Sequence, residues 1–163
     1  MKRIAYLLVA GSMVLTACNN EPAYKIVGIA EGIADGETVY LQEVQGRDLI
    51  NLDSAVVNKS TFTFKGRQDS AVNRYITYMT DGTRMMADLF LENGDINVTL
   101  GEDSRATGTP NNDIYQEFKD KFVTYNQEMG ELYQKARTDS TLTNEQREEL
   151  MKQIETKDAE AMD

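Results

Sequence analysis

The chain has 163 residues, a net charge of −10 and no histidine. This length is enough for one domain with a hydrophobic core. A chain without histidine cannot use Ser-His-Asp or Cys-His catalysis and lacks the commonest zinc ligand. Its acidic balance opposes binding to nucleic acid and to anionic lipid headgroups. We therefore predict no catalytic residue, no metal, no cofactor and no nucleic-acid partner.

The N-terminus has the features of an export signal. Lys2 and Arg3 precede an apolar run that extends from Ile4 to Leu15 and is followed by small residues. A basic start, a short apolar run and a small-residue exit are typical of a secretory signal peptide. The run is shorter than the roughly 20 apolar residues that a transmembrane helix needs. We predict that residues 1–17 are a signal peptide that is removed.

The only cysteine, Cys18, ends this segment in the stretch LTAC, which resembles the bacterial lipobox. We expect the Cys18 thiol to carry lipid, with palmitate among the acyl chains, and residues 18–23 to form a lipidated tether. Several acyl chains hold a protein at a membrane, whereas one myristoyl chain binds only marginally. The alternative is an ordinary cleaved signal with an unmodified cysteine. The expected location is the envelope of a Gram-negative bacterium. Asn19 in place of aspartate favours the outer membrane, facing the periplasm or the surface.

Residues 24–108 have the pattern of a β-domain. Short runs rich in β-branched and aromatic residues are separated by Gly, Asp and Asn turns, which is typical of antiparallel strands. Alternation places Val39 with Leu41, and Phe62 with Phe64, on one face of their strands. The runs, in chain order, are YKIVGIA, ETVYLQE, NLDSAVV, TFTFKG, RYITYM, MMADLFLE and INVTL. They predict a mainly β fold, an antiparallel β-sandwich or partial barrel of six to eight short strands.

Several glycines mark the turns of this domain. We expect hairpins at Asp81-Gly82 and at Asn93-Gly94, because these dipeptides favour the tight turns of antiparallel hairpins. Gly28, Gly32 and Gly36 lie four residues apart, but no helix follows them and their spacing is not that of a dinucleotide-binding loop. We interpret these three as turn glycines around a hairpin.

A C-terminal pair of helices is expected in residues 109–163. The first begins with Thr109 as N-cap and Pro110 at its first position. The second begins with a capping box of Thr143 and Gln146. The first helix carries an apolar stripe at Ile114, Phe118, Phe122, Tyr125, Met129 and Leu132, and the second a thinner one at Leu150, Ile154 and Ala161. We expect the first stripe to pack on the β-domain and the second helix to remain mostly undocked.

Two sets of polar residues could carry function. Oxygen ligands that would suit calcium occur at Glu102, Asp103, Asn111, Asn112 and Asp113, but not at the EF-hand spacing. We interpret them as a polar loop that leads to the helix cap. Three Asp-Ser-Ala or Asp-Ser-Thr triplets resemble an O-glycosylation pattern of exported proteins in some gut-dwelling Gram-negative bacteria, or occur by chance. Their acceptors would be Ser54, Ser70 and Ser140.

The chain resembles one family in its lipobox and in four further stretches, YKIVGIAEGIADGETVYLQ, LDSAVVNKSTFTFKG, DLFLENGDINVTL and GTPNNDIYQEFKD. The family is the β-rich, DUF4369-type domain of unknown function at the N-terminus of thioredoxin-like lipoproteins (TlpA-like, AhpC/TSA-related thiol-disulfide oxidoreductases). In the longer relatives, helices lead from this domain to a thioredoxin fold whose Cys-x-x-Cys pair does the redox chemistry. This chain has no such pair, so the resemblance implies a chain that is truncated before a catalytic domain.

Two functions are consistent with these features. In the first, the chain is the non-catalytic N-terminal accessory module of a membrane-anchored thiol-disulfide oxidoreductase, with a thioredoxin-like domain or a client protein as its partner. In the second, it is a free-standing envelope lipoprotein that binds a ligand or a protein and has no connection with redox chemistry. In both, the acyl chains on Cys18 attach it to the membrane.

Overall fold

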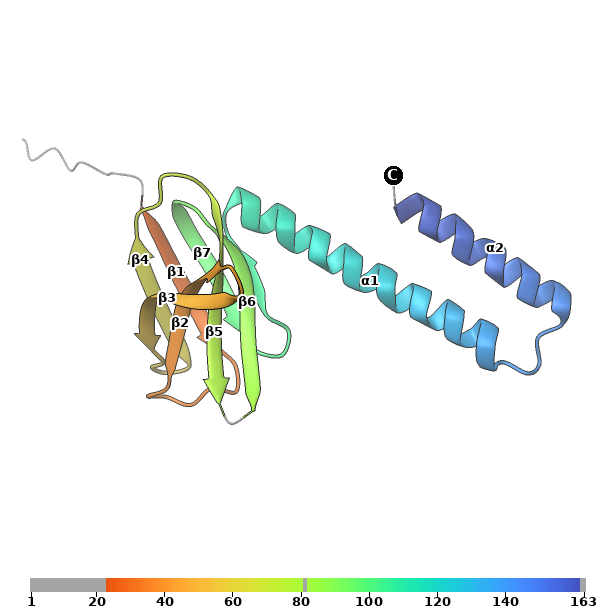
Figure 1. Cartoon of the computed structure of the whole chain (residues 1–163), viewed down its shortest axis with the longest axis horizontal. Coiled ribbons are helices and arrows are strands. Elements are labelled where there is room, and N and C mark those ends of the chain that lie inside the picture. The colour runs from red at the N-terminus through yellow and green to blue at the C-terminus, as the bar shows by residue number, and fades with distance from the viewer. Residues whose placement is uncertain (1–22, 81, 162–163) are drawn as a thin grey trace, which may run out of the picture.

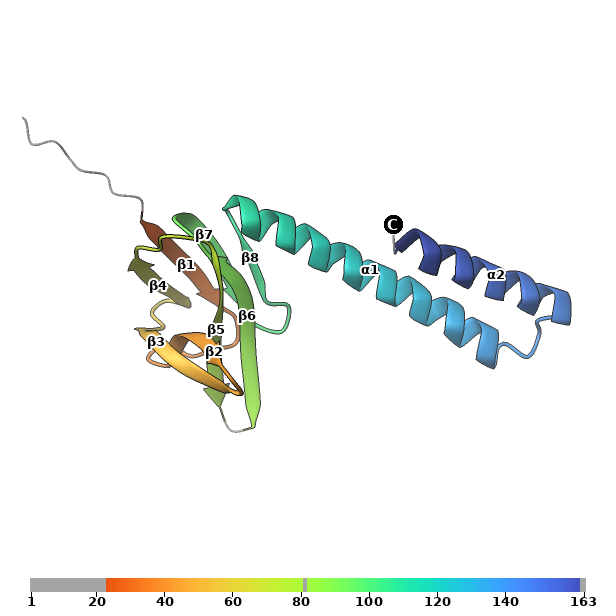
Figure 2. The same cartoon turned by 45° about the horizontal axis from the view of Figure 1, so that its top comes forward.

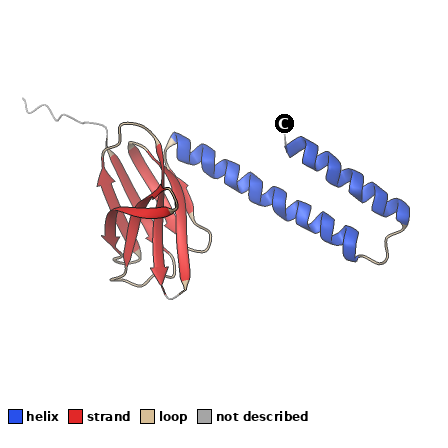
Figure 3. Cartoon of the chain, viewed as in Figure 1, coloured by secondary structure: helices blue, strands red, loops and turns tan. Residues whose placement is uncertain are grey.

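The computed structural model describes residues 23–80 and 82–161, which form eight strands and two helices (Figures 1 and 3). The elements are β1 (Tyr24–Ala30), β2 (Thr38–Gln45), β3 (Asp48–Val56), β4 (Thr61–Gly66), β5 (Val72–Thr80), β6 (Thr83–Leu91), β7 (Gly94–Leu100), β8 (Arg105–Thr107), α1 (Pro110–Thr138) and α2 (Asn144–Ala161). Every described element thus lies within residues 24–161, so a fragment that starts at residue 19 contains them all.

The strands form two four-stranded sheets that face each other across one hydrophobic core. One sheet has the order β4-β1-β7-β8 and the other β3-β2-β5-β6. Figures 1 and 2 show the two layers side by side, with both helices outside them. The described strands make two separate sheets, so the fold is a sandwich rather than a partial barrel. The prediction of a mainly β sandwich with two C-terminal helices is confirmed.

Alternation along the strands builds the core, as the sequence predicts. Phe62 and Phe64 point inward from β4, and their rings meet edge to face with centroids 5.9 Å apart. Val39 and Leu41 also point into the core, from β2. Burying side chains of this size contributes about 1.5–3 kcal/mol each, so the inward positions of the strands dominate the stability of the sandwich.

One pairing in the sandwich differs from the predicted antiparallel pattern. Strands β1 and β7 are parallel, with Tyr24 opposite Gly94 and Ala30 opposite Leu100. The hairpin predicted at Asn93-Gly94 is therefore wrong, because β6 and β7 belong to different sheets and the chain crosses between the layers at this point. The Asn93 side chain stabilises the crossing by accepting from the Gln68 amide (3.0 Å) and donating to the Gln68 carbonyl (2.6 Å).

The three glycines at intervals of four residues have two different roles. Gly32 and Gly36 have φ of 70° and 93° and lie in turns, as predicted. Gly28 lies inside β1, and a Cβ atom there would overlap the ring of Phe62 on the neighbouring strand. Gly28 is therefore required by packing, and its interpretation as a turn glycine is wrong.

The helices form an arm that projects from the sandwich. Helix α1 touches the sheets only near its start and then extends away, and α2 returns alongside it (Figures 1 and 2). The capping box of α2 is confirmed, because Gln146 N donates to the Thr143 hydroxyl (3.2 Å) and Thr143 N donates to the Gln146 side chain (2.9 Å). In the described part of the chain, neither helix is long and apolar enough to cross a bilayer.

The expected packing of the aromatic stripe is wrong. Phe118 and Phe122 are 60% and 54% exposed, whereas Leu150 and Ile154 of α2 are buried where the two helices meet. The stripe winds around α1. Met129, in its later part, is therefore buried where the helices meet, whereas Phe118 and Phe122, in its earlier part, face outward. The second helix is therefore docked, but on the first helix and not on the sandwich.

Candidate functional site

The joint between arm and sandwich is built from amide side chains on the first turns of α1. Strands β6 and β8 are edge strands of the two sheets, and an edge strand presents unpaired backbone groups. Asn112 accepts from Phe90 N (2.9 Å) and donates to Phe90 O (2.7 Å) on β6, and Gln116 accepts from Ala106 N (3.3 Å) on β8. Both amides are buried. One face of one helix thus binds one edge strand of each sheet.

A second layer of the joint is charged and aromatic. Asp88 on β6 accepts from the Tyr115 hydroxyl (2.6 Å) and from the Lys119 ammonium (2.8 Å). The Lys119 Nζ also lies 4.8 Å from the centre of the Tyr115 ring, within the range of a cation–π contact. Burial alone would raise the pKa of Asp88, but the two hydrogen bonds and the Lys119 charge outweigh it and lower that pKa. The hydrogen bond to Asp88, together with burial, raises the pKa of Tyr115 to about 12.

A bidentate ion pair holds the same helix to β8. The Arg105 guanidinium donates to both oxygens of Asp120, at 3.0 and 2.6 Å, and Gln116 Nε2 donates to Asp120 as well (2.9 Å). These contacts lower the pKa of Asp120, with the Arg105 bond as the largest cause. The ion pair is about half exposed, so it contributes little stability by itself, but its fork geometry orients the helix.

The joint has the properties of a structural connection. At neutral pH Tyr115 keeps its proton and Asp88 stays charged and paired, so neither is an available nucleophile or base. Three of the residues considered for calcium are engaged here, since Asn112 binds Phe90, Asn111 binds Glu92, and Asp113 accepts from Gly108 N. Across residues 23–80 and 82–161, His, Cys, Asp and Glu side chains form no group of three or more that could hold a metal.

An aromatic ridge leads from the joint onto the arm; we use this name for Tyr115, Phe118 and Phe122. Phe90 of β6 meets the Tyr115 ring edge to face at 5.4 Å. Tyr115 then stacks on Phe118 (6.5 Å, 11°), and Phe118 stacks on Phe122 (6.1 Å, 14°). The ridge therefore begins half-buried against the sandwich, at Tyr115, and ends exposed to solvent.

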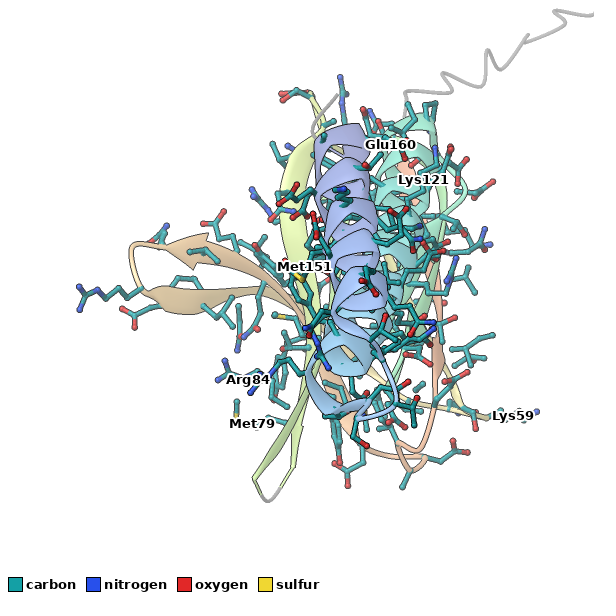
Figure 4. The ribbon with its side chains drawn as sticks, turned by 90° about the vertical axis from the view of Figure 1, so that its right-hand side faces the viewer. Lys59, Met79, Arg84, Lys121, Met151 and Glu160 are labelled. Carbon is teal, nitrogen blue, oxygen red and sulfur yellow. The ribbon has the colours of Figure 1, made fainter. Side chains whose placement is uncertain are left out.

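A groove of about 660 Å³ opens where the ridge meets the end of α2. Its lining residues are Phe118, Lys121, Phe122, Tyr125, Asp158 and Ala161. The Tyr125 hydroxyl donates to Asp158 and thus joins the two walls. Figure 4, which looks along the arm, labels Lys121 on α1 and Glu160 on α2 near the same end of the paired helices. This groove is the candidate functional site, because it combines exposed aromatic rings with a concave surface.

The residues predicted for modification do not form a site together. Cys18 lies outside the described residues. Ser54 is on β3, Ser70 lies between β4 and β5, and Ser140 lies in the link between the helices. All three serines are exposed, and they lie in separate parts of the chain.

Sequence reasoning missed the residues of the joint. The sequence presents Asn112 only as a possible calcium ligand or a polar residue near the helix cap, and Asp88 as one of many acidic residues. Phe118 and Phe122 were recognisable as an apolar stripe, but the pattern does not show what the stripe faces. Only the spacing of Asn112 and Gln116, one turn apart on one helix face, carried a signal of a shared role.

Comparison with known families covers the sandwich and the first residues of α1. A model for a domain of unknown function (DUF4369) matches residues 24–115, more than half of the chain. The match runs through the whole sandwich and ends at Tyr115, inside the joint. Searches of curated proteins and of solved structures give no match. The chain belongs to the DUF4369 family.

Proposed function

We propose that this chain is a lipid-anchored, non-catalytic module of a thioredoxin-like thiol-disulfide oxidoreductase system in the bacterial envelope. In this role the sandwich is attached to the membrane through its N-terminal tether, and the helical arm presents a thioredoxin-like domain or a client protein. The observation that carries the proposal is the joint, in which Asn112 and Gln116 hold the first turns of α1 to both sheets. A helix held in this way keeps a fixed direction relative to the sandwich.

The dimensions of the arm suit a spacer. Helix α1 has 29 residues, which at 1.5 Å per residue extend over about 40 Å. Strand β1, which follows the tether, pairs with β4 on one side, whereas α1 leaves from the opposite side, beside β6 and β8 (Figure 2). Attachment and presentation would thus occur on different sides of the sandwich.

The anchor can be tested directly on the protein made in a Gram-negative host. Cys18→Ala should abolish lipidation, whereas Ser12→Ala, a small change in the apolar run of the signal, should preserve it. Detergent phase partitioning and mass spectrometry of the N-terminal peptide are the measurements. We expect an acylated Cys18 in the unchanged protein and in Ser12→Ala. An unmodified Cys18 in the mature protein would contradict the proposed anchor.

The non-catalytic role has its own test. Disulfide exchange needs a thiolate nucleophile, and the fragment of residues 19–163 contains no cysteine. In an insulin-reduction assay this fragment should match the blank without protein. Turnover above the blank would show a redox group that the proposal does not include.

The groove favours a second function, a free-standing lipoprotein that binds a ligand, because its apolar lining and aromatic walls are common in binding sites. The genomic DNA downstream of the Asp163 codon distinguishes the two. A reading frame that continues into a segment with Cys-x-x-Cys supports the redox module. A stop codon with no oxidoreductase gene beside it favours the ligand-binding lipoprotein.

A further inference from the structure

We propose that the groove and the aromatic ridge are the docking site for an amphipathic helix that carries lysine or arginine beside its apolar stripe. This inference rests on the proposed function, because it names the kind of element by which a partner would contact the arm. It is carried by the geometry and charge of the groove.

The outer part of the aromatic ridge, Phe118 and Phe122, forms with Ile114 an unpartnered helix face in the described structure. Helix α2 lies against the later part of α1, where it buries Met129 and Ile154. Over the earlier part of α1, Ile114, Phe118 and Phe122 remain 68%, 60% and 54% exposed. These three follow one another at intervals of four residues, which is the spacing of one continuous helix face. The exposed face covers about 12 Å of the axis, or roughly two helical turns.

The stacked rings make this face rigid before any partner binds. The Phe118 and Phe122 rings are nearly parallel, and the row continues through Tyr115 to Phe90 in the sandwich. A row of stacked rings held at one end loses little side-chain entropy when a partner covers it. Aromatic residues in such preformed positions are typical anchors of protein interfaces.

The charges at the groove favour a basic partner. Lys121 is already paired with Glu117 (2.6 Å), and Lys157 is paired with Glu128. Asp158 accepts its hydrogen bond from the neutral Tyr125 hydroxyl, and Glu160 adds a further carboxylate at the end of α2 (Figure 4). The rim therefore has more carboxylates than ammonium groups. Basic side chains on a partner would be attracted to it, and acidic ones repelled.

The shape of the groove favours a helix as the occupant. Its walls are two antiparallel helices, and the surface between two helices accepts a third helix, whose side chains at i, i+3, i+4 and i+7 enter the groove. The apolar stripe of the bound helix would cover Phe118 and Phe122, and its flanking lysines or arginines would reach Asp158 and Glu160. A three-helix arrangement would bury the face that the two-helix arm leaves open.

The test uses the fragment of residues 19–163 and synthetic helical peptides of about 18 residues, long enough to be helical when bound. One peptide is built from Leu and Lys in an amphipathic pattern with a single Trp, and the control peptide replaces every Lys with Glu. The protein contains no tryptophan, so the peptide is the only source of tryptophan fluorescence and its emission reports binding. We expect the Leu/Lys peptide to bind and the Leu/Glu peptide to bind at least tenfold more weakly.

Matched variants locate the binding surface. Phe118→Ser should weaken binding of the Leu/Lys peptide by about tenfold or more, whereas Ile50→Ser, which removes an exposed apolar residue from β3, should leave it unchanged. Circular dichroism checks that both variants remain folded.

Equal affinity for both peptides, or an unchanged affinity in Phe118→Ser, would overturn the proposal. So would a fragment that is dimeric by sedimentation and becomes monomeric in Phe118→Ser, because the occupant would then be a second copy. The assay contains no lipid and no thiol, so a negative result does not affect the tests of the anchor and of the redox role.

Discussion

Asn112 of α1 and Phe90 of β6 are joined by a two-way hydrogen bond. The Phe90 amide donates to Asn112 Oδ1 at 2.9 Å, and Asn112 Nδ2 donates to the Phe90 carbonyl at 2.7 Å. A neighbouring strand would offer the edge of β6 the same donor and acceptor pair. A single buried side chain thus imitates a strand and connects the arm to the sandwich.

Asn112→Asp should destabilise the joint, because a carboxylate cannot donate to the Phe90 carbonyl. The change leaves that carbonyl facing an acceptor and introduces a buried charge, which we expect to cost about 2–3 kcal/mol in the free energy of unfolding. Urea unfolding measures it. The matched control is Asn126→Asp, on an exposed position of the same helix, which should change stability by less than about 0.5 kcal/mol. Equal effects in the two variants would mean that the two-way bond does not hold the joint.

The raised pKa of Tyr115 predicts that the protein loses stability in alkaline solution. Its pKa is about 12 in the folded protein, whereas the usual value of a tyrosine is about 10. The folded state therefore binds the phenolic proton more tightly than the unfolded state. The stability from this bond is fully present below about pH 10 and is lost as the pH rises from about 10 to about 12.

The measurement for Tyr115 compares the unchanged protein with Tyr115→Phe by urea unfolding at a series of pH values. Tyr115→Phe should be less stable near neutral pH, because Asp88 loses a hydrogen bond. The difference between the two proteins should shrink as the pH rises from about 10 toward 12. The comparison with Tyr115→Phe removes the pH effects that the two proteins share. A difference that stays constant over this range would contradict the assigned pKa.

The sequence predicts local features of this fold well and long-range features poorly. Alternation identified the inward residues of β2 and β4, and the Thr143–Gln146 capping box marked the start of α2, because both signals lie within a few residues. The parallel pairing of β1 with β7 was not predictable, since it joins segments about 70 residues apart. Asn93-Gly94 fits a hairpin and a crossing between sheets equally well, and only the partner of β7 decides between them.

The same limit applies to the candidate site. The spacing of Phe118 and Phe122 shows that they share a helix face, but it does not show whether that face meets a sheet, a helix or solvent. The polar contacts of Asn112 and Gln116 settle this question by fixing the direction of α1. Because buried polar contacts depend on which backbone groups are left unpaired elsewhere, they become visible only in the folded structure.

Gly28→Ala should destabilise the sandwich, because the added methyl group would overlap the Phe62 ring across the β1–β4 pair. Phe62 is buried, so relief requires a shift of the core, and we expect a cost of about 1–3 kcal/mol. Thermal or urea unfolding provides the measurement. Phe62→Leu should reduce the cost of Gly28→Ala in a double-mutant cycle. Strict additivity of the two changes would show that the ring is not the obstacle.

The last prediction concerns which apolar residues hold the arm together. Ile154 is 1% exposed between the helices, whereas Phe122 is more than half exposed. Ile154→Ala removes buried side-chain contacts and leaves a cavity, so it should destabilise the helical pair by about 2–4 kcal/mol. Phe122→Ala removes little buried area and should cost less than about 1 kcal/mol.

Hydrogen exchange of the arm amides is the suitable measurement, because the arm can open while the sandwich stays folded. Ile154→Ala should speed exchange in α2 and in the second half of α1, and leave the amides of β1 and β7 unchanged. The joint should keep the first turns of α1 protected in both variants, since Asn112 and Gln116 hold them to the sheets. If Phe122→Ala opened the arm as much as Ile154→Ala, the aromatic ridge would already be covered in the free protein. Faster exchange confined to Ile154→Ala would leave Phe122 available to a partner.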